Sequence, residues 1–252
     1  MALSHFLLLV FVSLFGTGNA KIITMQNKCD FTIWPGYQIV IPLAEGGRRN
    51  VDSGFELSAG KSVNFTVVDY ATIWGRTGCS FNESEFGSCI TGDCEGRLRC
   101  GDIFGRQFIH QQPVTYAYLE FGKNEYPDFF AINVGAGYNA PISIIPYGGS
   151  DAGDNKCKAT SCSIDLKESC PDELKQRFNG ITVACRNPCF HYPSVEPQFC
   201  CPYYGYEKDD CKPTNYFQVF EAACPSAGST PEFDISRSSM CSNANNYLIS
   251  FC

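Results

Sequence analysis

The stretch GSCITGDCEGRLRC, residues 87–100, places three cysteines close together, and Cys79 stands shortly before it. The sequence of 252 residues holds 16 cysteines, and no two of them have the C-x-x-C spacing that is common in zinc and redox sites. An even number of cysteines without that spacing favours a disulfide framework formed in an oxidising compartment. We therefore expect residues 79–100 to form a small stapled loop, and we expect no metal site and no cofactor.

The first 20 residues have the pattern of a secretory signal peptide. They contain no acidic residue, and an apolar run from Phe6 to Phe15 is followed by small residues up to Ala20. The run is too short to span a bilayer and its flank suits signal-peptidase cleavage. We expect a mature chain that begins near Lys21 and is secreted to the extracellular space, with no transmembrane segment.

The charge of the chain limits its partners. The formal net charge is −7 at pH 7, and an acidic surface disfavours nucleic acid and anionic membranes. Neutral polymers such as polysaccharides remain possible ligands. We expect a monomer.

Seven segments are rich in β-branched and aromatic residues and are separated by glycine and proline. This pattern favours an antiparallel sandwich over alternating strands and helices. The predicted strands lie within residues 21–27, 30–40, 61–76, 115–122, 129–134, 141–147 and 245–252.

One helix is expected, over Cys170–Phe178. Pro171 suits a first helical turn, and the acidic residues that follow it favour the positive end of the helix dipole. Asn179-Gly180 would end the helix.

Templates for cofactor binding and catalysis find no support in the sequence. Residues 135–140, GAGYNA, have the spacing of a dinucleotide-binding turn, but Pro141 and a β-branched run follow them where that motif needs a helix. The sequence has no G-x-S-x-G and no H-E-x-x-H. After the leader, the histidines are His110 and His191, which we expect to be surface or structural residues.

Two sequons could carry N-linked glycans in a secreted protein, at Asn64 and Asn82. Asn64 lies in a predicted strand, so we expect Asn82 to be the better acceptor.

The cysteine-rich stretch of residues 87–100 also carries a family resemblance. Its core, Cys89-x-Thr91-Gly92-Asp93-Cys94, resembles the signature of thaumatin-like proteins, the pathogenesis-related osmotin and thaumatin class, although Glu85 replaces the glycine that usually begins that signature. Every cysteine has a family counterpart. Further matching segments are NKCDFTIWPG, GGRRNVDSG, IWGRTGCSFN, CPDELK, CCPYYG, CKPTNYFQVFEAACPSA and NYLISFC.

The resemblance implies a mainly β fold, in which an antiparallel β-sandwich domain is joined to a disulfide-rich second domain and a small stapled third domain. We expect the sandwich to comprise residues 21–76, 102–150 and 225–252, the second domain 151–224 with its short helix, and the third 77–101. The implied disulfides are Cys29–Cys252, Cys79–Cys89, Cys94–Cys100, Cys157–Cys241, Cys162–Cys224, Cys170–Cys185, Cys189–Cys200 and Cys201–Cys211.

The resemblance also implies an acidic cleft between the first two domains, lined in the family by one arginine, one glutamate and three aspartates. Arg76 and Glu120 match the arginine and glutamate, and Asp234 matches the last aspartate. The other two aspartates are replaced by Ala131 and Ala136. The alternative interpretation of Arg76 and Glu120 is a structural ion pair at the edge of the sandwich.

The two alanines bear on function, because glycoside hydrolysis requires a pair of carboxyl groups across the scissile bond. We therefore expect a secreted defence protein that binds a carbohydrate polymer such as β-1,3-glucan without efficient catalysis. One alternative is a weak endo-β-1,3-glucanase that uses Glu120 and Asp234. Another is an inhibitor of a digestive enzyme, or a membrane-perturbing antifungal protein.

Overall fold

The computed structural model describes residues 20–45, 47–101, 113–123, 126–149, 157–191, 215–229 and 237–252. Several predictions concern residues outside these ranges, and they remain predictions. They are the leader up to residue 19, Asp234, His110, and the cysteines Cys200, Cys201 and Cys211.

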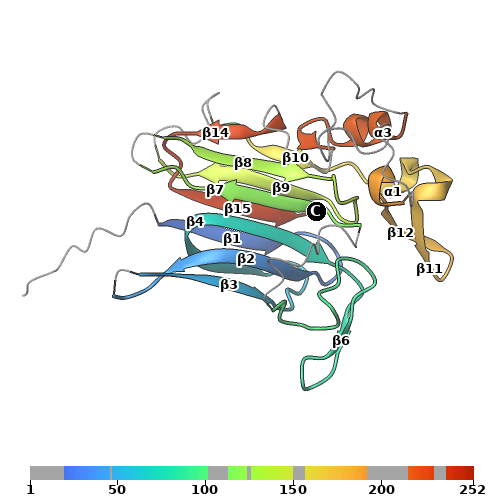
Figure 1. Cartoon of the computed structure of the whole chain (residues 1–252), viewed down its shortest axis with the longest axis horizontal. Helices are drawn as coiled ribbons and strands as arrows, with labels where there is room; N and C mark the ends of the chain where they lie inside the picture. The colour runs from blue at the N-terminus through green and yellow to red at the C-terminus, as the bar shows by residue number, and fades with distance from the viewer. Residues whose placement is uncertain are drawn as a thin grey trace, which may run out of the picture.

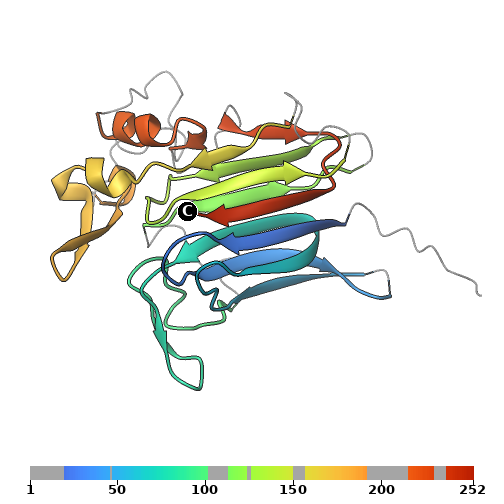
Figure 2. The same ribbon diagram turned by 180° about the vertical axis from the view of Figure 1, so that it is seen from behind.

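The strands form two layers that run along the long axis of the molecule (Figures 1 and 2). One layer has the order β10-β9-β15-β1-β4, and the other has the order β3-β2-β4-β7-β8, with β13 and β14 beside β8. The bounds of the first layer are β10 Thr160–Cys162, β9 Ile142–Tyr147, β15 Asn246–Phe251, β1 Lys21–Asn27 and β4 Ser62–Arg76. Those of the second are β3 Arg48–Gly54, β2 Trp34–Pro42, β7 Tyr116–Glu120, β8 Asp128–Asn133, β13 Ala227–Gly228 and β14 Ser239–Cys241.

Strand β4 belongs to both layers because it bends at a bulge. Its first half pairs with β1, and its second half pairs with β2 and β7. Between the halves, the register against β2 shifts from Val68 to Ala71, and Asp69 adopts a positive φ of 62°. An extra residue in one strand bends that strand and increases its twist, so the bulge turns β4 from one layer into the other.

Most strand pairs are antiparallel, as expected, but β1 pairs with β15 in parallel and β13 pairs with β8 in parallel. Parallel strands end at the same edge of a sheet. The residues that follow β1 and β15 therefore meet, and this is where Cys29 is bonded to Cys252. This bridge joins residues 223 positions apart.

The core lies between the two layers and is built by alternation along the strands. On β1 and β15, Ile23, Met25, Tyr247 and Ile249 point inward and are fully buried, while their neighbours point to the opposite face.

Within the described residues, no helix combines the length and the apolar character needed to cross a membrane.

Six disulfides join described residues, and each pairs the two cysteines that the family resemblance implies. They are Cys29–Cys252, Cys79–Cys89, Cys94–Cys100, Cys157–Cys241, Cys162–Cys224 and Cys170–Cys185. Cys189 is also disulfide-bonded, and its partner lies outside the described residues.

A helical and hairpin unit lies at one end of the sandwich, and the stapled loop with β5 (Ser80–Phe81) and β6 (Gly87–Ser88) projects from the other side of the same end (Figure 1). The unit contains helices α1 (Leu166–Ser169), α2 (Pro188–His191) and α3 (Asn215–Ala223), a 3₁₀ turn η2 (Asp172–Leu174), and the strands β11 (Lys175–Phe178) and β12 (Ile181–Cys185).

The helix expected over Cys170–Phe178 is wrong, and so is the expectation of one short helix in this region. The segment contains only the turn η2, and from Lys175 onward it is strand β11, paired with β12. Asn179 and Gly180 have φ values of 50° and 80°, so they form a two-residue hairpin turn of the kind that Asn-Gly favours. The Cys170–Cys185 bridge ties the end of β12 to the start of the segment.

Candidate functional site

The face of β4 and β7 that points away from the core carries aromatic and polar side chains. Cross-strand partners share a face of a sheet, and here the pairs are Tyr70 with Glu120, Thr72 with Tyr118, and Trp74 with Tyr116. The residues between them on both strands belong to the core. We call this surface the Glu120 face; it consists of Tyr70, Thr72, Trp74, Tyr116, Tyr118 and Glu120.

One end of the Glu120 face is covered by the stapled loop. Trp74 and Tyr116 are buried in a cluster with Cys94, Cys100 and other apolar side chains. At the other end, Glu120 is exposed, and Tyr70 and Tyr118 are partly exposed. A ligand could therefore reach the face at the Glu120 end.

The Thr91-Gly92-Asp93 motif holds the stapled loop against this face. The Trp74 indole donates a hydrogen bond to the Gly92 carbonyl over 3.1 Å, and Gly92 has a positive φ of 70°. The Asp93 carboxylate accepts from the backbone N–H groups of Cys89 and Gly96 at 2.9 and 2.7 Å. The residue types of the motif are thus explained by the local hydrogen bonds of the loop.

The stretch GAGYNA joins the three parts of the molecule. Tyr138 forms a backbone bridge with Cys185 of β12. The buried side chain of Asn139 donates to the Gly75 carbonyl of β4 and to the Thr91 hydroxyl of the stapled loop, at 2.7 and 2.8 Å. Gly137 adopts a positive φ of 102°, which glycine tolerates best, so this glycine and the asparagine have structural roles.

Glu120 and Tyr118 form the polar centre of the exposed end. The Tyr118 hydroxyl donates a hydrogen bond to Glu120 Oε2 over 3.1 Å. Partial burial, followed by the charge and the hydrogen bond of Glu120, raises the pKa of Tyr118 to about 12. Tyr118 therefore stays protonated at neutral pH. Tyr118 is not among the residues predicted for the site, although the alternation in YAYLE places Tyr116, Tyr118 and Glu120 on one face.

Ala131 and Ala136, for which the family resemblance predicts aspartates in relatives, lie on the same side of the sheet. Ala131 on β8 pairs with Tyr118, and Phe129 pairs with Glu120. Ala131 is thus the diagonal neighbour of Glu120, at a typical separation of about 7–8 Å. Ala136 is 4% exposed and lies in the cluster under the stapled loop. Neither position supplies a carboxylate to the Glu120 face.

The structure does not bring Arg76 next to Glu120. Glu120 pairs with Tyr70, six residues before Arg76 on β4, which is about 20 Å along a strand. The Arg76 side chain is fully buried. It donates to the carbonyls of Trp34, Arg97 and Leu98 at 2.9, 2.8 and 2.7 Å.

Arg76 therefore joins β2 to the stapled loop. Neither expected role, an exposed cleft residue or an ion-pair partner of Glu120, is seen. Burial lowers the pKa of Arg76 to about 10, and the charge of Asp93 opposes that effect, so the guanidinium remains charged at neutral pH.

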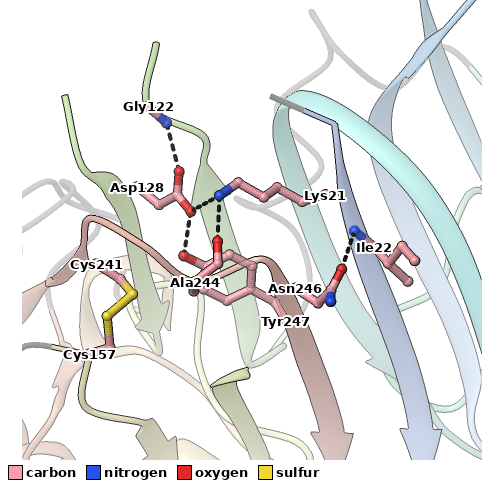
Figure 3. Close-up of polar contacts among 9 residues, drawn as sticks. All are labelled: Lys21, Ile22, Gly122, Asp128, Cys157, Cys241, Ala244, Asn246 and Tyr247. Atoms are coloured by element: carbon pink, nitrogen blue, oxygen red, sulfur yellow. Dashed lines mark hydrogen bonds and ion pairs between the residues drawn. A yellow bond between two sulfur atoms is a disulfide. The ribbon is translucent and has the colours of Figure 1, made fainter. Parts of the chain in front are cut away.

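The carboxylates of Asp128 and Asp69 are paired with cationic side chains. Figure 3 shows Lys21, Tyr247 and the Gly122 backbone turned toward Asp128. Asp128 is 4% exposed, and its oxygens lie 3.0 Å from Lys21 Nζ, 2.6 Å from the Tyr247 hydroxyl and 2.9 Å from the Gly122 nitrogen. This carboxylate is a structural group of the sandwich.

Asp69, at the bulge of β4, is paired with Arg48 and Lys123 at 2.7 and 3.0 Å. Burial alone would raise the pKa of Asp69, but the hydrogen bonds and charges of Lys123 and Arg48 outweigh burial and lower it. A general acid in glycoside hydrolysis requires a raised pKa, so Asp69 is unsuited to that role.

The described residues also contain no group of three or more His, Cys, Asp or Glu side chains placed to hold a metal ion.

Comparison with known proteins agrees with the fold. A family model described as the Thaumatin family matches residues 27–252. "Pathogenesis-related thaumatin-like protein 3.5" of Cryptomeria japonica is 38% identical over 249 residues, which cover 97% of this chain and 95% of the relative.

Two further relatives, each 33% identical to this chain, bear names that specify activities. The "Glucan endo-1,3-beta-glucosidase" of Prunus avium aligns over 94% of this chain and 93% of its own length. The "Alpha-amylase/trypsin inhibitor" of Zea mays aligns over 92% of this chain and 99% of its own length. The family match covers residues 27–252 of the 252 residues, and on that ground the chain belongs to the thaumatin family.

Proposed function

We propose that this protein is a secreted defence protein that binds a neutral carbohydrate polymer, β-1,3-glucan, at the exposed end of the Glu120 face and does not hydrolyse it efficiently. The observation that carries the proposal is the environment of Glu120. Its exposed carboxylate lies beside Tyr118, and its diagonal neighbour Ala131 has no acidic group.

The chemistry of this end suits a sugar chain. A carboxylate accepts hydrogen bonds from sugar hydroxyls, and hydrogen bonds to a charged group are about twice as strong as neutral ones. The partly exposed rings of Tyr70 and Tyr118 offer apolar surface for the C–H faces of a sugar. A net charge of −7 favours a neutral ligand over an anionic one.

Among the described residues, the carboxylates around Glu120 do not favour efficient hydrolysis. Retaining glycosidases hold two carboxyl groups about 5–5.5 Å apart, and inverting ones about 6.5–9.5 Å apart. Asp52 on β3 lies three strands from Glu120, about 14 Å between backbones at the usual strand spacing. Asp69 and Asp128 are engaged by cations.

Secretion is supported by the leader and by the disulfides, which form in oxidising compartments. A thaumatin-family defence protein outside the cell would meet the glucan of fungal walls, so we also propose an antifungal role. We also propose that the chain is divided into three domains. The sandwich domain comprises residues 21–76, 102–150 and 225–252, the disulfide-rich domain residues 151–224, and the stapled domain residues 77–101. Asn82, exposed at the tip of the β5–β6 hairpin, is proposed to carry a glycan.

The test is retention of the oxidised protein on insoluble β-1,3-glucan, with cellulose as a reference polymer and soluble laminarin as a competitor. Specific retention that laminarin reverses is expected. The same samples are assayed for release of reducing ends, and no release above background is expected. A protein that passes through the β-1,3-glucan unretained contradicts the proposal.

A weak endo-β-1,3-glucanase is the second candidate, favoured by the name of the Prunus avium relative. It would use Glu120 as the acid with Asp234 as its partner. Release of reducing ends that Glu120→Gln abolishes would support this candidate.

An enzyme inhibitor is the third candidate, favoured by the name of the Zea mays relative and by one structural feature. At the tip of the β11–β12 hairpin, the paired residues Phe178 and Ile181 are 49% and 69% exposed. Inhibition of a digestive enzyme that is lost in Ile181→Asp would support this candidate.

A further inference from the structure

The outer face of the first layer carries no charged side chain at twelve neighbouring positions. Register places these side chains in three rows across β9, β15, β1 and β4. We call this surface the neutral face; its rows are Tyr147, Asn246, Ile22 and Thr66, then Ile145, Leu248, Thr24 and Asn64, then Ser143, Ser250, Gln26 and Ser62.

Apolar groups are exposed on the neutral face. Ile22 is 41% exposed and Tyr147 is 37% exposed. The Tyr147 hydroxyl lies 3.1 Å from the Thr24 hydroxyl, so its ring crosses β15 to reach β1. Figure 3 shows Asn246 turned to the backbone of Ile22, with its Oδ1 accepting from the Ile22 nitrogen over 3.1 Å. The hydrogen bonds on the neutral face thus join uncharged groups.

This face also ends at a sheet edge. Residues 62–67 of β4 pair with β1, and no strand among the described residues pairs with their other side. Exposed edges that carry apolar residues favour aggregation, and natural proteins protect them. The sequence places no charge or proline on this part of β4.

The sequon Asn64-Phe65-Thr66 lies on this edge, and its two functional residues face outward. Asn64 and Thr66 are exposed, and Phe65 points inward and packs against the core. This follows from the two-residue period of a strand. Within the described part of the chain, the Asn64 side chain has no hydrogen-bond partner. Its position in a strand therefore does not hide it.

We propose that Asn64 carries an N-linked glycan and that this glycan lies over the neutral face. The glycan is uncharged and rich in hydroxyl groups, and its sugars also present C–H faces. It can hydrogen-bond to Thr24, and it can cover Ile22 and the Tyr147 ring. It protects the edge of β4 and leaves the Glu120 face, which lies on the other layer, open to ligand. This inference rests on the secretory route proposed above.

The first test is occupancy, measured by mass spectrometry of the full chain secreted from a eukaryotic host, before and after enzymatic deglycosylation. An Asn82→Gln background removes the other sequon. In that background, Thr66→Ala is expected to remove the remaining glycan, and Thr66→Ser, which restores an acceptor sequon, is expected to keep it.

The second test is coverage, measured by hydroxyl-radical labelling of the same variants. Tyr147 and Leu248 are expected to be labelled several-fold faster in Thr66→Ala than in Thr66→Ser. Phe178, on the distant β11–β12 hairpin, is the internal reference and is expected to be unchanged.

A secreted chain with an unmodified Asn64 overturns the proposal. A modified Asn64 with unchanged labelling of Tyr147 and Leu248 overturns the part that places the glycan on the neutral face. Glucan binding is not a readout here, and secretion is scored from total protein in the medium. Failure of the proposed function would therefore be seen separately from an empty Asn64.

Discussion

Ala131 on β8 is the diagonal cross-strand neighbour of Glu120 on β7, because Tyr118 pairs with Ala131 and Glu120 pairs with Phe129. A second carboxylate at position 131 would stand about 7–8 Å from Glu120 by backbone geometry. From positions at that separation, two side chains can bring their carboxyl groups to the separations of about 5–9.5 Å at which such pairs act on a glycosidic bond. Ala131 therefore supplies no acidic partner at a position that neighbours Glu120 on this face.

The substitution Ala131→Asp tests this relationship. Ala131 is 3% exposed, so burial and the neighbouring Glu120 would raise the pKa of the new carboxyl group, as a general acid requires. We expect measurable release of reducing ends from laminarin by Ala131→Asp and none by the natural chain. Ala131→Asn is the matched control, because asparagine has nearly the same shape as aspartate and cannot ionise. Equal activity in the two variants would exclude a carboxylate effect.

The pair of Lys21 and Asp128 is expected to stabilise the sandwich. Their side chains are 14% and 5% exposed, and removing one partner of a buried ion pair costs about 3–5 kcal/mol. Lys21→Met should lower the free energy of unfolding by about that amount in denaturant titrations. Lys123→Met is the control, since the Lys123 side chain is 62% exposed and an exposed pair contributes about 0–1 kcal/mol.

The double variant Lys21→Met/Asp128→Asn checks the cause. Asparagine can accept from the Gly122 N–H through its Oδ1 and can donate its amide N–H to the Tyr247 hydroxyl oxygen. It leaves no buried charge, so the double variant should be more stable than Lys21→Met alone. A double variant that is less stable would show that the unpaired carboxylate is not the origin of the loss.

Arg76 is expected to hold the stapled loop and to have no direct contact with ligand. Arg76→Lys removes the fork that reaches the Arg97 and Leu98 carbonyls, and each lost hydrogen bond to a charged donor costs about 1.5–3 kcal/mol. Amide hydrogen exchange of residues 89–100 should accelerate, while exchange in β1 and β15 should not. Loss of glucan binding with unchanged exchange would place Arg76 in the ligand site instead.

Stability is expected to fall above about pH 10, where tyrosine ionises in the unfolded chain. Burial raises the pKa of Tyr116, Tyr138 and Tyr247 above that value in the folded chain, and the hydrogen bond to Asp128 adds to the effect at Tyr247. The folded state then binds more protons than the unfolded state, so stability is retained below pH 10 and lost as the pH rises further.

Circular dichroism and tyrosinate absorbance, recorded together along an alkaline titration, check this expectation. The absorbance of the buried tyrosines should appear with unfolding. Tyr247→Phe should show a weaker pH dependence of the unfolding free energy. Ionisation of all tyrosines near pH 10 with the fold intact would contradict the assignment.

The sequence predicted the β class because its alternating runs match strands such as β1, β7 and β15. The six disulfides between described residues could not be deduced from spacing, and they came from the family resemblance. The helix over Cys170–Phe178 was predicted from its acidic first turn, but the same Asn179-Gly180 that can end a helix also closes a hairpin. Local patterns could not decide between a helix that ends at Asn179-Gly180 and a hairpin that turns there, because the pairing of β11 with β12 depends on the tertiary fold.

The candidate site was predictable only in part for a similar reason. Glu120 and Ala131 could be placed on one face by matching positions in the family, whereas the burial of Arg76 depends on carbonyls from β2 and the stapled loop. These carbonyls come from residues 34, 97 and 98, and no sequence pattern indicates that they converge on one guanidinium. The role of Tyr118 likewise required its distance to Glu120.

The most direct test of the proposed function is the binding constant of the oxidised chain for insoluble β-1,3-glucan, compared with that of Glu120→Gln. Glu120→Gln keeps an acceptor oxygen and loses its charge, so the expected cost is about 1–1.5 kcal/mol, or roughly 5- to 10-fold in Kd. Glu83→Gln, at an exposed glutamate of the β5–β6 hairpin, should bind as the natural chain does. Retention of the natural chain with that loss in Glu120→Gln is the predicted result, and equal binding by Glu120→Gln and the natural chain would contradict it.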